Sequence, residues 1–118
     1  MLEQLAEAIN KRWNEYRAFV DDDELVVADW KDDRNIRFSP VDQDSYNSRF
    51  IIWGLDRLEE LGWFPELRPT YEDEPDEPKY TCFIRKVDDS WGYTNLYPKA
   101  DTRAEAVARA LLAALEGK

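Results

Sequence analysis

The apolar residues at the start of the chain follow a helical spacing. Intervals of three and four positions separate Leu2, Leu5, Ile9, Trp13, Tyr16 and Val20. Such intervals place side chains on one side of a helix, so the pattern predicts an amphipathic helix over residues 2–19. The acidic run at residues 21–24 ends this pattern.

Two shorter segments with strand character follow the acidic run. Residues 25–30 contain the β-branched pair Val26 and Val27, and residues 34–38 place Ile36 and Phe38 on one side of an extended chain. The polar residues 31–33 between them suit a turn. The pattern therefore predicts a small hairpin here.

A second helix is predicted over residues 44–61. Ser39-Pro40 interrupts the chain before it, and Asp42, Asp44 and Ser45 are residue types that cap helix N-termini. Because its apolar stripe is wide, we expect this helix to be the most buried one. The stripe contains Tyr46, Phe50, Ile51, Trp53, Leu55, Leu58 and Leu61.

Three strands and a last helix are predicted in the second half of the chain. Residues 63–71 alternate in polarity, but their prolines lack an N–H donor, so this strand belongs at a sheet edge. Strands over 79–87 and 91–97 follow, joined by a turn at 88–90. Thr102-x-x-Glu105 matches a capping box for the last helix, and Gly117 suits its end.

The predicted order of elements is α-(ββ)-α-β-β-β-α. Strands joined by short turns are antiparallel neighbours. The sequence therefore predicts an α+β fold, in which three helices pack on a three-stranded antiparallel meander, with or without the extra N-terminal hairpin. No internal repeat or linker is visible, so we expect residues 1–118 to form one domain.

Several of these segments resemble one known family. Phe38-Ser39-Pro40-Val41-Asp42-Gln43-Asp44 leads into the helix over 45–61 and then Gly62-Trp63; further on stand Ser90-Trp91-Gly92-Tyr93, Ala100-Asp101-Thr102 and the alanine-rich helix over 104–112. Together they resemble the phage ABA sandwich domain family of small phage and prophage proteins. Val107-Ala108-Arg109 departs from the Ile-Cys-Arg expected at that place. The resemblance implies a fold and a phage or prophage origin, and no catalytic residue.

Composition and charge narrow the classes of function. The chain has 118 residues, 36% of them charged, and a net charge of −10. An excess of acid repels phosphate backbones, so direct binding of nucleic acid is not expected. The longest apolar runs have six residues and the N-terminus lacks a basic segment, so neither a membrane span nor a secretory signal is predicted. We expect a cytoplasmic protein, in the host cytosol if phage-encoded, with a reduced Cys82.

The net negative charge is concentrated in two segments. Residues 21–30 hold five acids and no base, and residues 63–78 hold six acids and one base. Clustered acid of this kind either is an ordinary solvated loop or generates a field directed at a basic partner surface. The acidic residues predicted to bind a partner are Asp21, Asp22, Asp23, Glu24, Asp29, Glu72, Asp73, Glu74, Asp76 and Glu77.

Aromatic residues are the second candidate feature. Trp and Tyr serve as anchors in protein interfaces when they are exposed, although in a small domain they more often fill the core. Trp91, Tyr93 and Tyr97 are predicted on one face of the third strand, and the others flank the acidic segments. The aromatic residues predicted to bind a partner are Trp30, Trp63, Tyr71, Trp91, Tyr93 and Tyr97.

No catalytic residue, metal site or cofactor is predicted. The chain has no histidine to activate a serine or Cys82, which lies between apolar neighbours and is expected to be a buried, inert thiol. Asp42-x-Asp44 and the 21–24 run could supply oxygen ligands to Mg²⁺ or Ca²⁺, but neither has the spacing of a calcium loop. Helix capping explains Asp42 and Asp44 without a metal.

Four hypotheses about function remain open at this level. The first is a non-enzymatic phage- or prophage-type binding protein, such as an anti-defence (anti-CRISPR-like) inhibitor, that occludes a basic nucleic-acid-binding surface of a host protein or nucleoprotein complex. The second is an immunity-type protein that neutralises a toxin. The third is a homodimeric structural or assembly module that uses the aromatic sheet face. The fourth, a carboxylate-metal enzyme, is the weakest.

Overall fold

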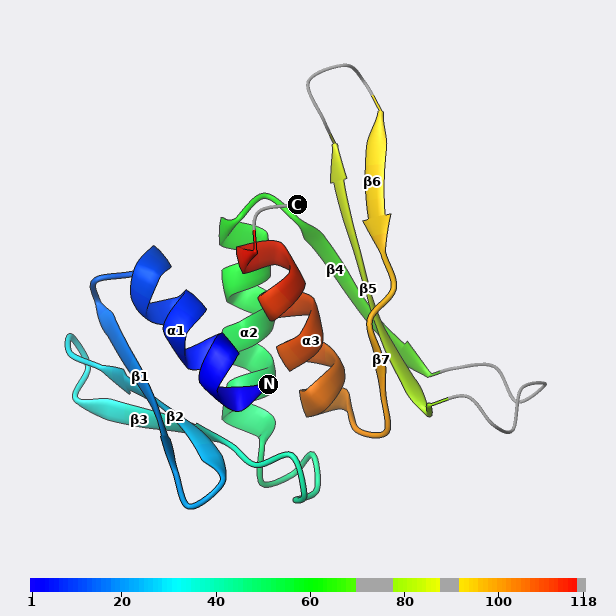
Figure 1. The fold of residues 1–118 in the computed structure, drawn as a ribbon. Helices are drawn as coiled ribbons and strands as arrows, with labels where there is room; N and C mark the ends of the chain where they lie inside the picture. The colour runs from blue at the N-terminus through cyan, green and yellow to red at the C-terminus, as the bar shows by residue number, and fades with distance from the viewer. Residues whose placement is uncertain (70–77, 88–91, 117–118) are drawn as a thin grey trace.

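The computed structural model describes residues 1–69, 78–87 and 92–116 (Figure 1). Among these residues the chain forms three helices and seven strands. The helices are α1 (Leu2–Arg12), α2 (Ser48–Glu60) and α3 (Arg103–Leu115). The strands are β1 (Tyr16–Asp21), β2 (Glu24–Asp29), β3 (Arg34–Phe38), β4 (Phe64–Pro69), β5 (Tyr80–Val87), β6 (Tyr93–Leu96) and β7 (Lys99–Ala100). None of these helices is long and apolar enough to cross a membrane.

The helices form a middle layer between two antiparallel sheets (Figure 1). The first sheet has the order β1-β2-β3 and packs on α1, whereas the second has the order β4-β5-β6 and packs on α3. The α2 helix lies against α3 and also contacts β3 and β4. The predicted α+β class is therefore confirmed. Each sheet covers the helices with one face, and no helix or strand of the described chain covers its other face.

The first sheet contains a strand where the sequence predicts helix. The helix over 2–19 is correct as far as Arg12 and wrong beyond it, because Trp13 is extended and β1 begins at Tyr16. Tyr16 and Val20 lie on the core side of a strand, where alternate residues share a face. Their spacing of four suits both a helix and a strand, which is why the helical stripe misleads. The predicted hairpin over residues 25–38 is confirmed as β2 and β3.

The side chain of Asn10 closes the outer edge of β1. Its Oδ1 accepts a hydrogen bond from the Ala18 N–H at 2.7 Å, and its Nδ2 donates to the Ala18 carbonyl at 2.8 Å. The amide therefore pairs with the strand as a neighbouring peptide group would. This contact joins α1 to the edge of the first sheet.

In the second sheet β6 and β7 form one interrupted strand. Both pair with β5 in the same continuous register, from Val87 opposite Tyr93 to Tyr80 opposite Ala100. Between them, the Cys82 N–H donates to the Pro98 carbonyl at 2.9 Å, but Pro98 has no N–H to return the bond. The second sheet is thus the predicted meander, and β4 with Pro65 and Pro69 lies at its edge as predicted.

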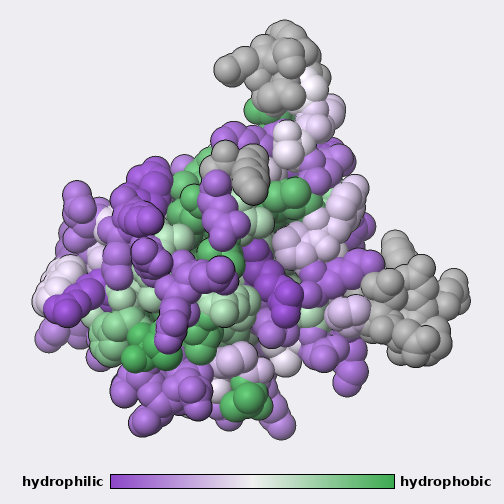
Figure 2. Space-filling view, in the orientation of Figure 1, coloured by the Kyte–Doolittle hydropathy of each residue, from purple (hydrophilic) through white to green (hydrophobic). Residues whose placement is uncertain are grey.

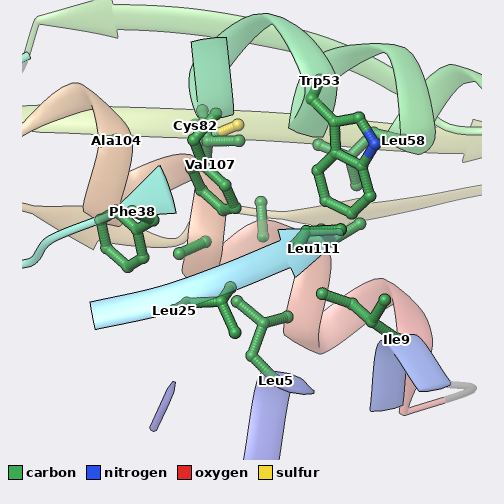
Figure 3. Close-up of a cluster of buried hydrophobic side chains, with 14 of the residues drawn as sticks. Leu5, Ile9, Leu25, Phe38, Trp53, Leu58, Cys82, Ala104, Val107 and Leu111 are labelled. Carbon is green, nitrogen blue, oxygen red and sulfur yellow. The ribbon is translucent and has the colours of Figure 1, made fainter. Parts of the chain in front are cut away.

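The core lies inside the helical layer and against both sheets (Figure 3). Leu25 and Phe38 reach it from the first sheet and Cys82 from the second, around Val107 of α3 (Figure 3). The α2 and α3 helices approach closely where Gly54 faces Val107. A Cβ atom built on Gly54 would lie 2.5 Å from Val107 Cγ1, far inside van der Waals contact. Gly54 is therefore required for the distance between the two helices.

Replacing Gly54 by alanine is expected to destabilise the protein. Because the added methyl group overlaps Val107, Gly54→Ala should lower the free energy of unfolding by about 1–3 kcal/mol in urea denaturation. Val107→Ala removes the opposing methyl groups, so the double variant should lose less stability than the two single losses added together. Strict additivity would contradict this account of the contact.

The N-terminus of α3 is capped from two places in the sequence. Thr102 Oγ1 accepts from the Glu105 N–H at 3.2 Å, as the capping-box motif predicts. The Asp44 carboxylate accepts from the N–H groups of Arg103 at 3.2 Å and Ala104 at 3.1 Å. The interpretation of Asp44 as a cap of α2 is therefore wrong, since it caps α3 from the segment preceding α2, whose own N-cap is Asn47.

Removing the Asp44 carboxylate should destabilise the protein through α3. Asp44→Ala leaves two N–H groups without their acceptor, and we expect a loss of about 1 kcal/mol in the free energy of unfolding. Asp42→Ala is the matched control, because Asp42 is exposed and its carboxylate makes no hydrogen bond to any described residue. Equal losses in the two variants, measured by thermal or urea unfolding, would contradict the capping role.

Candidate binding surface

The uncovered face of the second sheet gathers aromatic side chains and arginines. In β5 the residues Cys82 and Ile84 point into the core, so Phe83 and Arg85 point to the opposite side. The register places residues of β4 and β6 on that same side. We call this surface the aromatic–arginine face; its rings and arginines are Phe64, Arg68, Phe83, Arg85, Tyr93 and Tyr97. Glu66, opposite Phe83, lies on the same side of the sheet.

Phe83 is the centre of the aromatic–arginine face. Its neighbours leave its side chain only 8% exposed, although no helix covers it. The Tyr97 ring lies against it with centroids 4.9 Å apart, and the guanidinium carbons of Arg68 and Arg85 stand 5.0 and 5.4 Å from its ring centroid. These are distances at which a cation is attracted to an aromatic face.

Arg85 is held in place by three neighbours. Besides Phe83, its guanidinium carbon lies 5.1 Å from the Tyr93 ring centroid. Its Nε–H donates to Asn95 Oδ1 at 3.2 Å. Among the described residues no carboxylate forms a salt bridge with Arg68 or Arg85. The stacking therefore orders a planar set of N–H donors on this face.

The rim of the face is exposed and apolar. The exposed fractions are 65% for Phe64, 62% for Tyr93 and 56% for Tyr97, and Val87 beside Tyr93 is 48% exposed. Hydrophilic residues dominate the surface seen in Figure 2, with smaller hydrophobic areas over the helical layer. A group of large rings on one uncovered sheet face is unusual for a small acidic protein and suits an interface.

The structure separates the aromatic residues that the sequence groups together. Tyr93 and Tyr97 lie on one face, as predicted, and belong to the aromatic–arginine face. Trp63 is 3% exposed within the core, with Lys86 Nζ 5.8 Å from its ring, so it leaves the set of surface candidates. Trp30 is 65% exposed but follows β2 of the other sheet. Tyr71 and Trp91 lie outside the described residues.

The acidic residues 21–23 project from a tight hairpin turn. Asp21 pairs with Glu24, and the two-residue loop between them has positive φ at Asp22 (50°) and Asp23 (61°). Positive φ at both positions characterises the type I′ turn that joins twisted strands, and Asp tolerates it better than most residues. Asp21, Asp22 and Asp23 are all exposed. We call residues 21–23 the acidic turn.

Glu24 and Asp29 do not extend this cluster. Glu24 accepts from Arg37 Nη1 at 3.1 Å and from the Tyr46 hydroxyl at 2.9 Å; the latter bond raises the pKa of Tyr46. Asp29 lies at the opposite end of β2, about 17 Å away at 3.4 Å per residue. There it accepts from the Lys31 N–H at 2.9 Å and shapes the next turn. The remaining acidic candidates, Glu72, Asp73, Glu74, Asp76 and Glu77, lie outside the described residues.

Four members of the aromatic–arginine face, Phe64, Arg68, Phe83 and Arg85, are not among the residues predicted from the sequence. Phe64 and Arg68 belong to the alternating strand with prolines. Arg85 belongs to β5, whose apolar residues Cys82 and Ile84 lie on the opposite face. The usable signal is the period of two, because Phe83 and Arg85 necessarily share the face opposite Cys82 and Ile84.

A groove lies between β3 and α2. It has a volume of about 290 Å³ and is lined by Arg34, Ile36, Arg49, Ile52, Trp53 and Asp56, among others. Its charges are of both signs. The Trp53 Nε1 donor is buried without a hydrogen-bond partner among the described residues. The groove is open and carries no convergent set of like groups that would select a ligand.

Chemistry at Cys82 is suppressed by its surroundings. Its side chain is fully buried, and burial raises the pKa of the thiol to about 12. Within residues 1–69, 78–87 and 92–116 no group of three or more Cys, Asp or Glu side chains is arranged to hold a metal ion.

Comparison of the chain with protein-family models, with curated proteins and with solved structures found no match. The geometry of the surface is therefore the basis for inferring function.

The thiol of Cys82 is expected to be unreactive while the protein is folded. At pH 8 a thiol of pKa about 12 is almost entirely protonated, so dithionitrobenzoate should label the native protein very slowly and the urea-unfolded protein rapidly. The raised pKa also means that the folded state holds this proton more tightly. The stability that this bound proton contributes to the folded state is complete below the unfolded pKa of about 8.5. It decreases as pH rises from there toward the folded pKa of about 12. Fast labelling of the native protein would contradict the burial.

Proposed function

We propose that this protein is a non-catalytic binding protein that docks onto a partner protein through the aromatic–arginine face. The proposal rests on one observation. Large rings that are more than half exposed surround two stacked arginines on a sheet face that no described element covers. Burying such rings against a partner removes apolar area from water, at roughly 25 cal/mol per Å².

The ordering of the arginines supports this function. A free arginine side chain loses rotamer entropy when it binds, at a cost of about 0.5–1.5 kcal/mol. Arg85 has already been ordered by Phe83, Tyr93 and Asn95, so less of this cost remains at the moment of binding. A fitting partner surface has an apolar centre for the rings and carboxylates at the positions of the guanidinium groups.

A second candidate function uses the acidic turn. Three exposed carboxylates at one hairpin tip favour contact with a basic surface. This supports the hypothesis of an anti-defence, anti-CRISPR-like inhibitor of phage or prophage origin that occludes a nucleic-acid-binding surface. It equally supports an immunity-type protein that neutralises a basic toxin.

Quantitative capture from a lysate of the cell that encodes the protein tests both candidates. Phe64→Ser/Arg68→Gln alters the aromatic–arginine face within β4. Ile52→Ser/Arg49→Gln is its matched control on α2, because Ile52 is 63% exposed and Phe64 65%. We expect the face variant to lose about tenfold or more of a partner that the control retains, as for an interface hot spot.

A third variant completes this experiment. Asp21→Asn/Asp22→Asn/Asp23→Asn removes the charge of the acidic turn, and asparagine keeps the tolerance for positive φ. If this variant alone loses the partner, and high salt releases the partner from the native protein, the second candidate replaces the first. Equal capture by the face variant and its control would overturn the docking role of the aromatic–arginine face.

A further inference from the structure

Three of the four sheet edges are protected against pairing with another strand. The edge of β1 is paired with the Asn10 amide and lies beside α1. The β3 edge is short and carries Arg34 and Arg37. The edge formed by β4 contains Pro65 and Pro69. Charge, proline and coverage are the usual means by which proteins prevent edge-to-edge association.

The register of the second sheet shows which backbone groups face its two edges. Residues opposite each other in an antiparallel pair alternate between hydrogen-bonded and non-bonded pairs. Because Cys82 bonds to Pro98, the pairs of residue 84 with 96 and of 86 with 94 are also bonded. The N–H and C=O groups of Tyr93, Asn95 and Tyr97 therefore point away from β5, toward the open edge.

The same alternation accounts for the prolines of β4. The β5 residues that do not bond to β6 bond to β4, which leaves Pro65, Leu67 and Pro69 facing outward. Two of those three positions lack an N–H donor. One edge of the second sheet thus rejects a further strand, whereas the other presents donors and acceptors at residues 93, 95 and 97. Figure 1 shows β6 at the margin of the molecule with no labelled element beyond it.

The β6 edge also lacks charge. Residues 93–97 read Tyr-Thr-Asn-Leu-Tyr, whereas β1, β2, β3, β4 and β5 each contain charged side chains. We propose that a second copy of this chain covers the edge, with the two β6 strands paired antiparallel about a twofold axis at Asn95. This inference goes beyond the proposed function and is independent of it.

The sequence of β6 is complementary to itself in this register. Around a twofold axis at Asn95, Tyr93 of one copy stands opposite Tyr97 of the other, and Asn95 stands opposite Asn95. All three residues direct their backbone groups to the edge, so the hydrogen-bonding pattern closes without a bulge. Aromatic pairs directly opposite each other on neighbouring strands stabilise the pairing of the strands. Thr94 stands opposite Leu96 on the face toward the helices.

The charge of the whole molecule predicts an unusual salt dependence. Each copy carries −10, so two copies repel each other, while the paired strands contain no charge of their own. Screening weakens the repulsion and leaves the backbone pairing intact. Association should therefore strengthen as salt is raised from 20 to 300 mM, which shortens the Debye length from about 20 Å to about 6 Å. A contact made by charge attraction would weaken over the same range.

Sedimentation equilibrium of the full chain tests the register through two matched variants. Tyr93→Lys/Tyr97→Lys places like charges opposite each other in the proposed pair, and Tyr93→Lys/Tyr97→Glu places opposite charges there. Both variants lose the same two rings. We expect the first to weaken dimerisation by about tenfold or more relative to the second, since like charges directly opposite destabilise a strand pair. Equal dissociation constants would overturn the register.

A covalent cross-link provides the second measurement. Opposed Cα atoms in a bonded antiparallel pair lie about 5.5 Å apart, within the range a disulfide spans. Asn95→Cys should therefore form a disulfide-linked dimer under mild oxidation, while Cys82 stays buried and inert. Asn35→Cys is the control, because Asn35 is an exposed residue in the edge strand β3 of the first sheet.

The outcomes are separable from those of the capture experiment. A native protein that remains monomeric at about 200 µM in 300 mM salt, a concentration between the millimolar and micromolar dissociation constants of weak complexes, overturns the proposal. Faster cross-linking of Asn35→Cys than of Asn95→Cys overturns it in favour of a first-sheet contact. A dimer that fails to form leaves the docking role of Phe64 and Arg68 to be decided by the capture experiment, because both residues lie on β4, away from the β6 edge.

Discussion

The close approach of α2 and α3 at Gly54 and Val107 sets the dimensions of the whole molecule. The two helices can touch with a backbone-to-methyl contact only because residue 54 lacks a Cβ atom. Because most side chains of α3 are small alanines, α1, α2 and β5 can all pack against this helix, and six of its residues are buried. Both sheets pack against this layer of helices. A wider spacing between the helices would displace one sheet relative to the other and open the core between them.

Placing helices inside and sheets outside exposes one face of each sheet. The two outer faces differ in how the apolar residue at their centre is covered. Val26 in the centre of the first sheet is completely buried between Phe19 and Arg37 of the adjacent strands, and Glu24 pairs with that arginine. Phe83 is the equivalent residue of the second sheet, but its neighbours are rings and guanidinium groups that are themselves exposed. The outer face of the second sheet therefore exposes more aromatic and guanidinium groups that a partner could contact than the outer face of the first sheet does.

Elements with a strong local signal were predictable from the sequence, and long-range contacts were not. The central helix, the capping box at Thr102 and the edge strand with prolines all follow from local chemistry. The helix predicted over 44–61 forms over 48–60, and the expectation that it is the most buried helix is wrong, because α3 has six buried residues and α2 has four. The strand at 16–21 did not, because Tyr16 and Val20 fit two periods and the pairing with β2 decides between them. Tyr93 and Tyr97 were predicted on one face. Arg68 contacts Phe83 from the side of β4 and Tyr97 contacts it from the other side, although the two residues are 29 positions apart, and only the register shows that they share this neighbour.

The order of the strands also bears on how the chain reaches its folded state. When β6 and β7 are counted as one interrupted strand, every hydrogen-bonded pair of strands is consecutive in the sequence, and the longest connection between two paired strands runs from Pro69 to Tyr80. Short loops cost little closure entropy, which favours early and separate formation of the two meanders. The slow step then becomes the docking of α2 against α3, since that contact joins two halves with no shared hydrogen-bond ladder. Amide hydrogens of the two sheets would accordingly exchange as two distinct groups. Both groups would exchange together only when the contact between α2 and α3 is lost.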